Sequence, residues 1–170
     1  MIGDCFSFLR ERGADERLIR HGRVVCEVGL IIATALREVG IQADTQILIP
    51  SLILHDAGKI IHPDELTGEG SEHLEAGWRL LIENNVDEKI ARTCISHERW
   101  DEMECSIEEL IVALADALWK GERIAELEKM FIERIWSLRG GDYWETFLRL
   151  DTLFESIAEE GSKRLLESDI

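Results

Sequence analysis

Four of the five histidines fall into an ordered series with two aspartates. The six members of this series are His21, His55, Asp56, His73, His97 and Asp116. Imidazole nitrogens and carboxylate oxygens bind divalent transition metals, and six such groups are more than one closed tetrahedral site needs. The series therefore predicts a cluster of two metal ions. His62, which precedes Pro63, is the only histidine outside it.

The order of these residues suggests how two ions would share them. Adjacent residues on a helix point about 100° apart, so His55 and Asp56 bind one ion only if it lies between their directions. The first site would contain His21, His55, Asp56 and Asp116. In the second site, His73 and His97 would be joined by the other carboxylate oxygen of Asp56, which would bridge the ions. Two six-coordinate ions would still leave positions for water or substrate, which is typical of a catalytic site.

The elements that must position these residues are predicted to be helices, because apolar residues recur with helical spacing along almost the whole chain. Helices are expected over residues 15–39, 44–59, 71–85, 87–98, 106–119, 123–138 and 143–166. The second would begin near Pro50 or bend there. No useful alternating strand is found, so the expected fold is an all-α bundle of about seven or eight helices.

Helix ends and one isolated carboxylate mark the predicted site. Ser71 and Asp87 are expected to cap helices that carry His73 and His97 near their ends. Ser106 and Glu109 form a capping box at the start of the most apolar helix. The only polar side chain from residue 110 to 119 is that of Asp116. A lone buried carboxylate costs several kcal/mol unless it is paired or metal-bound, which favours a ligand role. The loop acids, by contrast, are expected to be solvated: Asp64, Glu65, Glu69 and Glu72.

Composition and charge limit the class of protein. The 170 residues suit one domain, with residues 122–170 as a helical extension of it or a dimer surface, and a homodimer is one expected state. A net charge of −16 would repel a nucleic-acid polymer but does not exclude a small phosphorylated metabolite beside bound cations. Four scattered cysteines, of which Cys26 and Cys94 are expected in the core, are typical of reduced thiols. With no secretion signal or membrane span, a cytoplasmic location is expected.

The ligand series and its context match a known pattern. The order H…HD…H…H…D, centred on Leu54-His55-Asp56-Ala57-Gly58-Lys59, resembles the HD-domain superfamily of metal-dependent phosphohydrolases in its two-metal version. The likeness covers residues 21–123 and includes His73-Leu74-Glu75-Ala76-Gly77 and Leu114-Ala115-Asp116-Ala117-Leu118. It implies an all-α fold and hydrolysis of a phosphoester or phosphoanhydride, usually of a nucleotide.

Particular branches of that superfamily fit less well. The cyclic-dinucleotide phosphodiesterase branch has paired histidines and a Gly-Tyr-Pro motif, whereas Ser96-His97-Glu98-Arg99-Trp100 has one histidine and no such motif after it. The dinucleoside-tetraphosphate hydrolase branch has His-Thr-x-Gly at this place. The 5'-nucleotidase branch has a glutamate where this chain has Lys59. The nucleotide therefore stays open.

The resemblance implies a mechanism in which a hydroxide bridging the two ions attacks phosphorus in line. Asp56 and Lys59 are the expected catalytic residues, and Lys59 could also contact a phosphate oxygen. Arg23, Arg99 and Lys120 are further candidates for substrate binding. The candidate ions are iron, manganese, nickel, cobalt, zinc and magnesium, with iron or manganese favoured.

Two other functions are compatible with the same ligands. Some members of the superfamily are di-iron oxygenases, which the ligand series alone does not separate from hydrolases. The other alternative is a non-catalytic module that uses the metals to hold a nucleotide.

Overall fold

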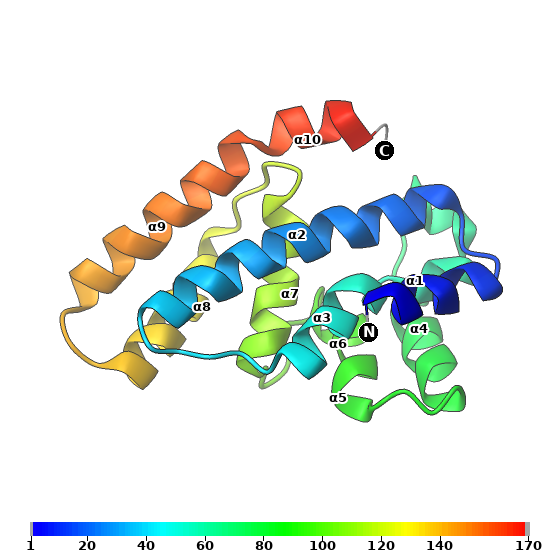
Figure 1. Cartoon of the computed structure of the whole chain (residues 1–170), viewed down its shortest axis with the longest axis horizontal. Coiled ribbons are helices and arrows are strands. Elements are labelled where there is room, and N and C mark those ends of the chain that lie inside the picture. The colour runs from blue at the N-terminus through cyan, green and yellow to red at the C-terminus, as the bar shows by residue number, and fades with distance from the viewer. Residues whose placement is uncertain (1, 169–170) are drawn as a thin grey trace.

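The computed structural model describes residues 2–168, and these form a bundle of helices with no strand among them (Figure 1). The α-helices are α1 (Ile2–Glu11), α2 (Glu16–Glu38), α3 (Thr45–Leu54), α4 (Glu72–Glu83), α5 (Glu88–Ala91), α6 (Thr93–Ser96), α7 (Ile107–Leu118), α8 (Ala125–Arg139), α9 (Tyr143–Glu159) and α10 (Gly161–Ser168). Two 3-10 helices, η1 (Ala57–Ile60) and η2 (Pro63–Leu66), follow α3. The predicted all-α fold is confirmed. In the described residues, eight α-helices are longer than the four-residue α5 and α6.

Several helix starts lie where the sequence predicts them, because short polar side chains cap them. Asp15, Asp44 and Asp87 each accept a hydrogen bond from the backbone amide two residues further on. The Ser106 hydroxyl accepts from the Glu109 amide at 3.2 Å, and the Glu109 carboxylate accepts from the Ser106 amide at 2.8 Å. These bonds satisfy N–H groups that have no partner inside the helix, so they fix where α2, α3, α5 and α7 begin.

The start of α4 is capped differently from the prediction. Ser71 makes no side-chain cap bond. The Glu65 carboxylate, which comes from η2, instead accepts from the backbone amides of Glu72 and His73, each at 3.1 Å. The expectation that Glu65 is a solvated loop acid is therefore wrong, because its side chain is 8% exposed and binds the helix that carries His73.

Three predicted helices are shorter or interrupted in the structure. The second ends at Leu54, and the chain turns through His55 and Asp56 into η1; Pro50 lies inside α3. The predicted helix over residues 87–98 is divided at Arg92 into α5 and α6. The last predicted helix is divided at Glu160 into α9 and α10. Near the site, His55, Asp56 and His97 therefore lie just after the ends of short helices and not inside continuous ones.

Close packing of α2 on α3 organises the centre of the bundle (Figure 1). A Cβ at Gly22 would lie 2.9 Å from the carbonyl oxygen of Ile53, and one at Gly29 would lie 2.4 Å from the Leu52 side chain. Both glycines are on the face of α2 that meets α3, since they are seven residues apart. This approach places His21, the neighbour of Gly22, next to the end of α3.

The C-terminal helices add further core. Phe131 of α8 and Phe154 of α9 are fully buried, with ring centroids 5.9 Å apart. Trp144, by contrast, is 65% exposed at the start of α9, where its ring contacts those of Tyr143 and Phe147. The α8–α9 hairpin extends beyond α2 there (Figure 1).

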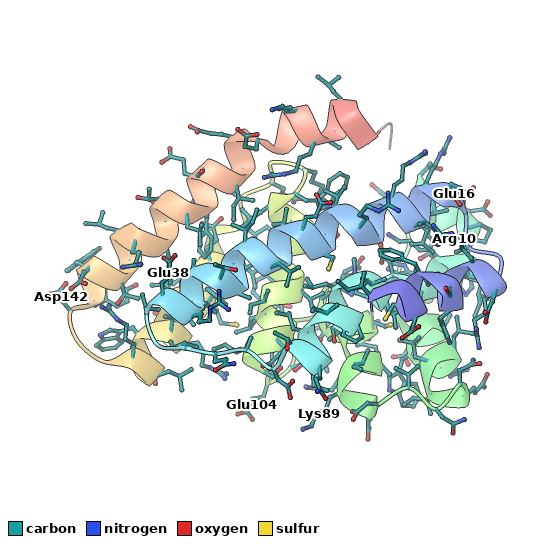
Figure 2. All side chains as sticks on the ribbon, in the orientation of Figure 1. Arg10, Glu16, Glu38, Lys89, Glu104 and Asp142 are labelled. Atoms are coloured by element: carbon teal, nitrogen blue, oxygen red, sulfur yellow. The ribbon has the colours of Figure 1, made fainter. Side chains whose placement is uncertain are left out.

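The surface carries the acidic charge and the interior carries the thiols. Charged residues such as Asp142, Lys89 and Glu104 lie at the outer edges of the bundle (Figure 2). All four cysteines are buried and free, as expected for Cys26 and Cys94. Among residues 2–168, none of the helices has both the length and the apolar character needed to cross a membrane.

Candidate metal centre

The structure brings all six predicted ligand residues together from five different segments. His21 comes from α2, His55 and Asp56 from the turn after α3, His73 from α4, His97 from the end of α6 and Asp116 from α7. Triads of their donor atoms lie within 4.8 Å of one another. We call these six residues the ligand cluster: His21, His55, Asp56, His73, His97 and Asp116.

One half of the ligand cluster, the first group, contains His21, His55, Asp116 and one oxygen of Asp56. The His21 Nε2 atom lies 3.1 Å from His55 Nε2 and 3.1 Å from Asp56 Oδ2. Asp116 Oδ1 lies 3.2 Å from His21 Nε2 and 3.5 Å from His55 Nε2. Two imidazole nitrogens and two carboxylate oxygens therefore face a common point.

The other half, the second group, uses the other oxygen of the same aspartate. Asp56 Oδ1 lies 3.3 Å from His73 Nε2 and 3.5 Å from His97 Nε2. Asp56 thus presents Oδ2 to the first group and Oδ1 to the second. This is the arrangement that a carboxylate bridging two ions requires.

Hydrogen bonds at Nδ1 orient three of the imidazole rings. His55 Nδ1 donates to the Leu52 carbonyl at 3.0 Å, and His97 Nδ1 donates to the Thr93 carbonyl at 2.9 Å. His73 Nδ1 donates to the Glu65 carboxylate. Because carbonyl and carboxylate oxygens only accept, each Nδ1 carries a proton, and whenever the ring is neutral its Nε2 lone pair faces the cluster. Histidines that bind metals are held in the same way.

Burial and unsatisfied atoms show that the donor set fits a cation. His55, Asp56, His73 and His97 are all buried. Within the described residues, Asp56 Oδ1 and His73 Nε2 have no hydrogen-bond partner, although they lie 3.3 Å apart. Buried acceptors without a partner are costly, and a positive ion between them would satisfy both. Asp116, at 22% side-chain exposure, leaves the cluster open toward solvent.

The pKa values in the ligand cluster also depend on how closely its carboxylates and imidazoles lie together. Burial alone would lower the pKa of His21 and His73, but the nearby carboxylates of Asp56, and of Asp116 or Glu98 respectively, outweigh it and raise these pKa values to about 9 and about 10. Burial lowers the pKa of His55. Burial opposes ionisation of Asp56, but the surrounding imidazoles hold its pKa well below the usual range. In the metal-free protein, protons therefore occupy places that a cation would take.

Of the four predicted substrate-binding residues, only Lys59 contacts the ligand cluster within the part of the chain that the structure describes. Its Nζ lies 2.7 Å from Asp56 Oδ2, and the side chain is mostly buried. Asp56, despite the cost of burying the ammonium, raises the pKa of Lys59, so the lysine is charged. A positive group therefore lies at the edge of the candidate site.

The other three predicted substrate-binding residues contact partners outside the ligand cluster. Arg23 lies over the Phe6 ring, with its guanidinium carbon 5.7 Å from the ring centroid. The side chains of Arg99 and Lys120 lie 3.8 Å from Glu75 and 3.2 Å from Glu122, respectively. Their role in substrate binding stays a prediction.

Sequence reasoning missed two acidic residues at the centre. Glu65 orients His73, as described above. Glu98 places Oε1 3.4 Å from His73 Nε2 and 3.8 Å from His97 Nε2. Its position directly after His97 was the available signal. His62, which the sequence left outside the series, lies beside Glu72, with 3.7 Å between Nδ1 and Oε2.

One comparison with known proteins agrees with this geometry. A family model described as "HD domain" matches residues 25–119, which include five of the six members of the ligand cluster. A tRNA (cytidine(56)-2'-O)-methyltransferase of Picrophilus torridus is 27% identical over 141 residues. That match covers 74% of this chain and 38% of the methyltransferase, so the chain spans well under half of its curated relative. No solved structure matches the chain.

Proposed function

The chain belongs to the HD domain family, and from that premise we propose that it is a two-metal phosphohydrolase. Its substrate would be a small phosphorylated metabolite, a nucleotide, with a phosphoester or phosphoanhydride bond to cleave. The observation that carries this proposal is the position of Asp56, which turns one carboxylate oxygen toward each of two groups of imidazoles. A site for a single ion would not need an aspartate shared in this way.

The donors divide into two proposed ion sites. The first ion would be held by His21, His55, Asp116 and Asp56 Oδ2, and the second by His73, His97 and Asp56 Oδ1. When bound, two divalent ions lower the pKa of a coordinated water and neutralise charge on phosphoryl oxygens. The remaining chemistry belongs to the side chains around them.

Lys59 is suited to bind the phosphate. Its ammonium already lies beside a carboxylate oxygen of the ligand cluster, so a phosphoryl group at the cluster would come within its reach. Its charge would add to transition-state stabilisation where negative charge accumulates. The hydrogen bonds at His55, His73 and His97 would keep the Nε2 atoms in place while the substrate changes charge. Lys59 and Asp56 are therefore the proposed catalytic residues.

The methyltransferase activity named for the Picrophilus relative is not part of this proposal, because the chain spans 38% of that protein. The six-residue ligand cluster supports the proposed metal-assisted hydrolysis, because all of its members belong to this chain.

The test is a screen of nucleotides for released phosphate, first with anaerobic Fe²⁺ and then with Mn²⁺. We expect turnover with one class of phosphorylated substrate and its loss in Asp56→Ala. His62→Ala is the matched control and should keep full activity, since His62 lies outside the ligand cluster. Oxygen consumption is measured in the same reactions under air.

The outcomes separate the competing functions. Oxygen uptake with iron, without phosphate release, would identify an oxygenase and overturn the proposal. Tight nucleotide binding with no turnover under either metal would identify a binding module and would equally overturn it.

A further inference from the structure

Glu98 lies beside the second group of donors, which has one carboxylate fewer than the first group. Its Oε1 atom is 3.4 Å from His73 Nε2 and 3.8 Å from His97 Nε2. The side chain is 42% exposed, whereas the Asp56 side chain is 2% exposed. The Glu98 carboxylate therefore approaches the second group from a more exposed position than the buried aspartate.

The two groups differ by one carboxylate if Glu98 is left out. The first group has two imidazoles and two carboxylates, whereas the second has two imidazoles and only the shared Asp56. With Glu98 included, both have the same composition. The distances from an imidazole nitrogen to a neighbouring donor in the first group run from 3.1 to 3.7 Å, and those from an imidazole nitrogen to a carboxylate oxygen in the second, with Glu98, run from 3.3 to 3.8 Å.

These separations are close to the distances between neighbouring ligands of one ion. Nitrogen and oxygen ligands lie about 2.0–2.2 Å from a divalent ion such as zinc, so neighbouring ligands are about 3–3.6 Å apart. The Glu98 oxygen meets this condition toward His73 and exceeds it slightly toward His97. A small rotation of an exposed side chain is enough to correct the difference.

Charge favours the same role. Two divalent ions would bring four positive charges to a place where Asp56 and Asp116 supply two negative ones and Lys59 adds a positive one. A third carboxylate reduces this excess in a partly buried site, where unbalanced charge is costly.

We propose that Glu98 is the fourth protein ligand of the second metal ion. The proposal rests on the presence of two ions, which is part of the proposed function, and adds a ligand that the H…HD…H…H…D series does not contain. Glu98 then gives both ions two imidazoles and two carboxylates.

The experiment is a titration of metal-free protein with Mn²⁺, in which electron paramagnetic resonance measures the free ion. We expect wild type to bind two ions. Glu98→Gln should keep the first site unchanged and weaken the second at least tenfold, in line with the effect of changes around metal sites. Glu98→Asp, which keeps the charge but withdraws the carboxylate by one methylene, should also weaken the second site.

The control is Glu102→Gln, which removes the same charge from an exposed position four residues away and should bind both ions as wild type does. Circular dichroism melts of the metal-free variants establish that all are folded. A Glu98→Gln protein whose second site matches wild type would overturn the ligand role while leaving two-ion binding intact. Equal weakening in Glu102→Gln, or none in Glu98→Asp, would assign the effect to charge alone. A wild type that binds no second ion would overturn both this proposal and the two-metal function.

Discussion

At the scale of single residues, the candidate site depends on side chains that orient other side chains through hydrogen bonds. Glu65 accepts a hydrogen bond from His73 Nδ1 and also from the backbone amides of Glu72 and His73. Burial opposes ionisation of Glu65, but these hydrogen bonds outweigh it and lower its pKa. One carboxylate therefore fixes both the tautomer of His73 and the start of the helix that carries it.

Glu65→Gln should weaken metal binding at the second group. A glutamine keeps the shape but turns a charge-assisted acceptor into a neutral amide, and loss of such an outer partner reduces metal affinity or activity by about 10- to 100-fold. We expect the first group, which does not include His73, to bind as in wild type. Mn²⁺ titration of each variant measures this, with Glu69→Gln, an exposed acid of the same loop, as the control. Equal affinities at the second group in Glu65→Gln and wild type would contradict the orienting role.

At the scale of elements, the site depends on how closely η1 packs on α4. A Cβ added at Gly58 would lie 1.8 Å from the carbonyl oxygen of His73 and 2.6 Å from the amide nitrogen of Gly77. Both atoms belong to backbone, which cannot move aside as a side chain can. This contact sets the distance between the turn that carries Asp56 and the helix that carries His73.

Gly58→Ala should therefore destabilise the protein and separate the two halves of the ligand cluster. Overpacking in a filled core costs about 1–3 kcal/mol, and here the obstructing atoms are backbone, so we expect at least that loss of unfolding free energy. Gly3→Ala is the control, because a Cβ there meets nothing within 4 Å. Urea unfolding measures the stability of both. A Gly58→Ala protein as stable as wild type would show that η1 and α4 can move apart freely.

The elements also show what the sequence could and could not predict. Apolar spacing located most helices, and the predicted caps Asp87 and Ser106 act as expected because such caps are local. The presence of histidine and aspartate, which bind divalent metals, identified the six residues that the fold brings together. Glu65 and Glu98 were missed because their roles depend on distances across the chain, which residue spacing does not contain. The helix break at Arg92 was missed because no glycine or proline lies there, and the break at Glu160 was missed although Gly161 follows it.

At the scale of the whole molecule, the buried acceptors couple metal binding to folding. Ions that bind only the folded state stabilise it by about 2.7 kcal/mol for each site when their concentration is 100 times the dissociation constant. For a chain of this length, 1 kcal/mol corresponds to about 2–4 °C in Tm. Two occupied sites should therefore raise Tm by about 10–20 °C over protein treated with a chelator. Asp56→Asn should lose most of this increase and His62→Ala should keep it, as differential scanning calorimetry can determine. An unchanged Tm on adding Mn²⁺ would contradict binding at a preformed cluster.

The stability of the metal-free protein should fall as pH rises above about 6.5, the ordinary pKa of histidine. Burial opposes protonation, but neighbouring carboxylates outweigh it and raise the pKa of His21 to about 9 and of His73 to about 10, so the folded state keeps protons that the unfolded state has lost. Their contribution is fully present below pH 6.5 and disappears as pH rises through 9 to 10. Divalent ions compete with these protons, so the increase in Tm caused by saturating Mn²⁺ should grow between pH 6.5 and 9. Thermal melts with and without the ion across this range measure both trends. A metal-free Tm that rises over the same interval would show that these imidazoles do not hold the protons assigned to them.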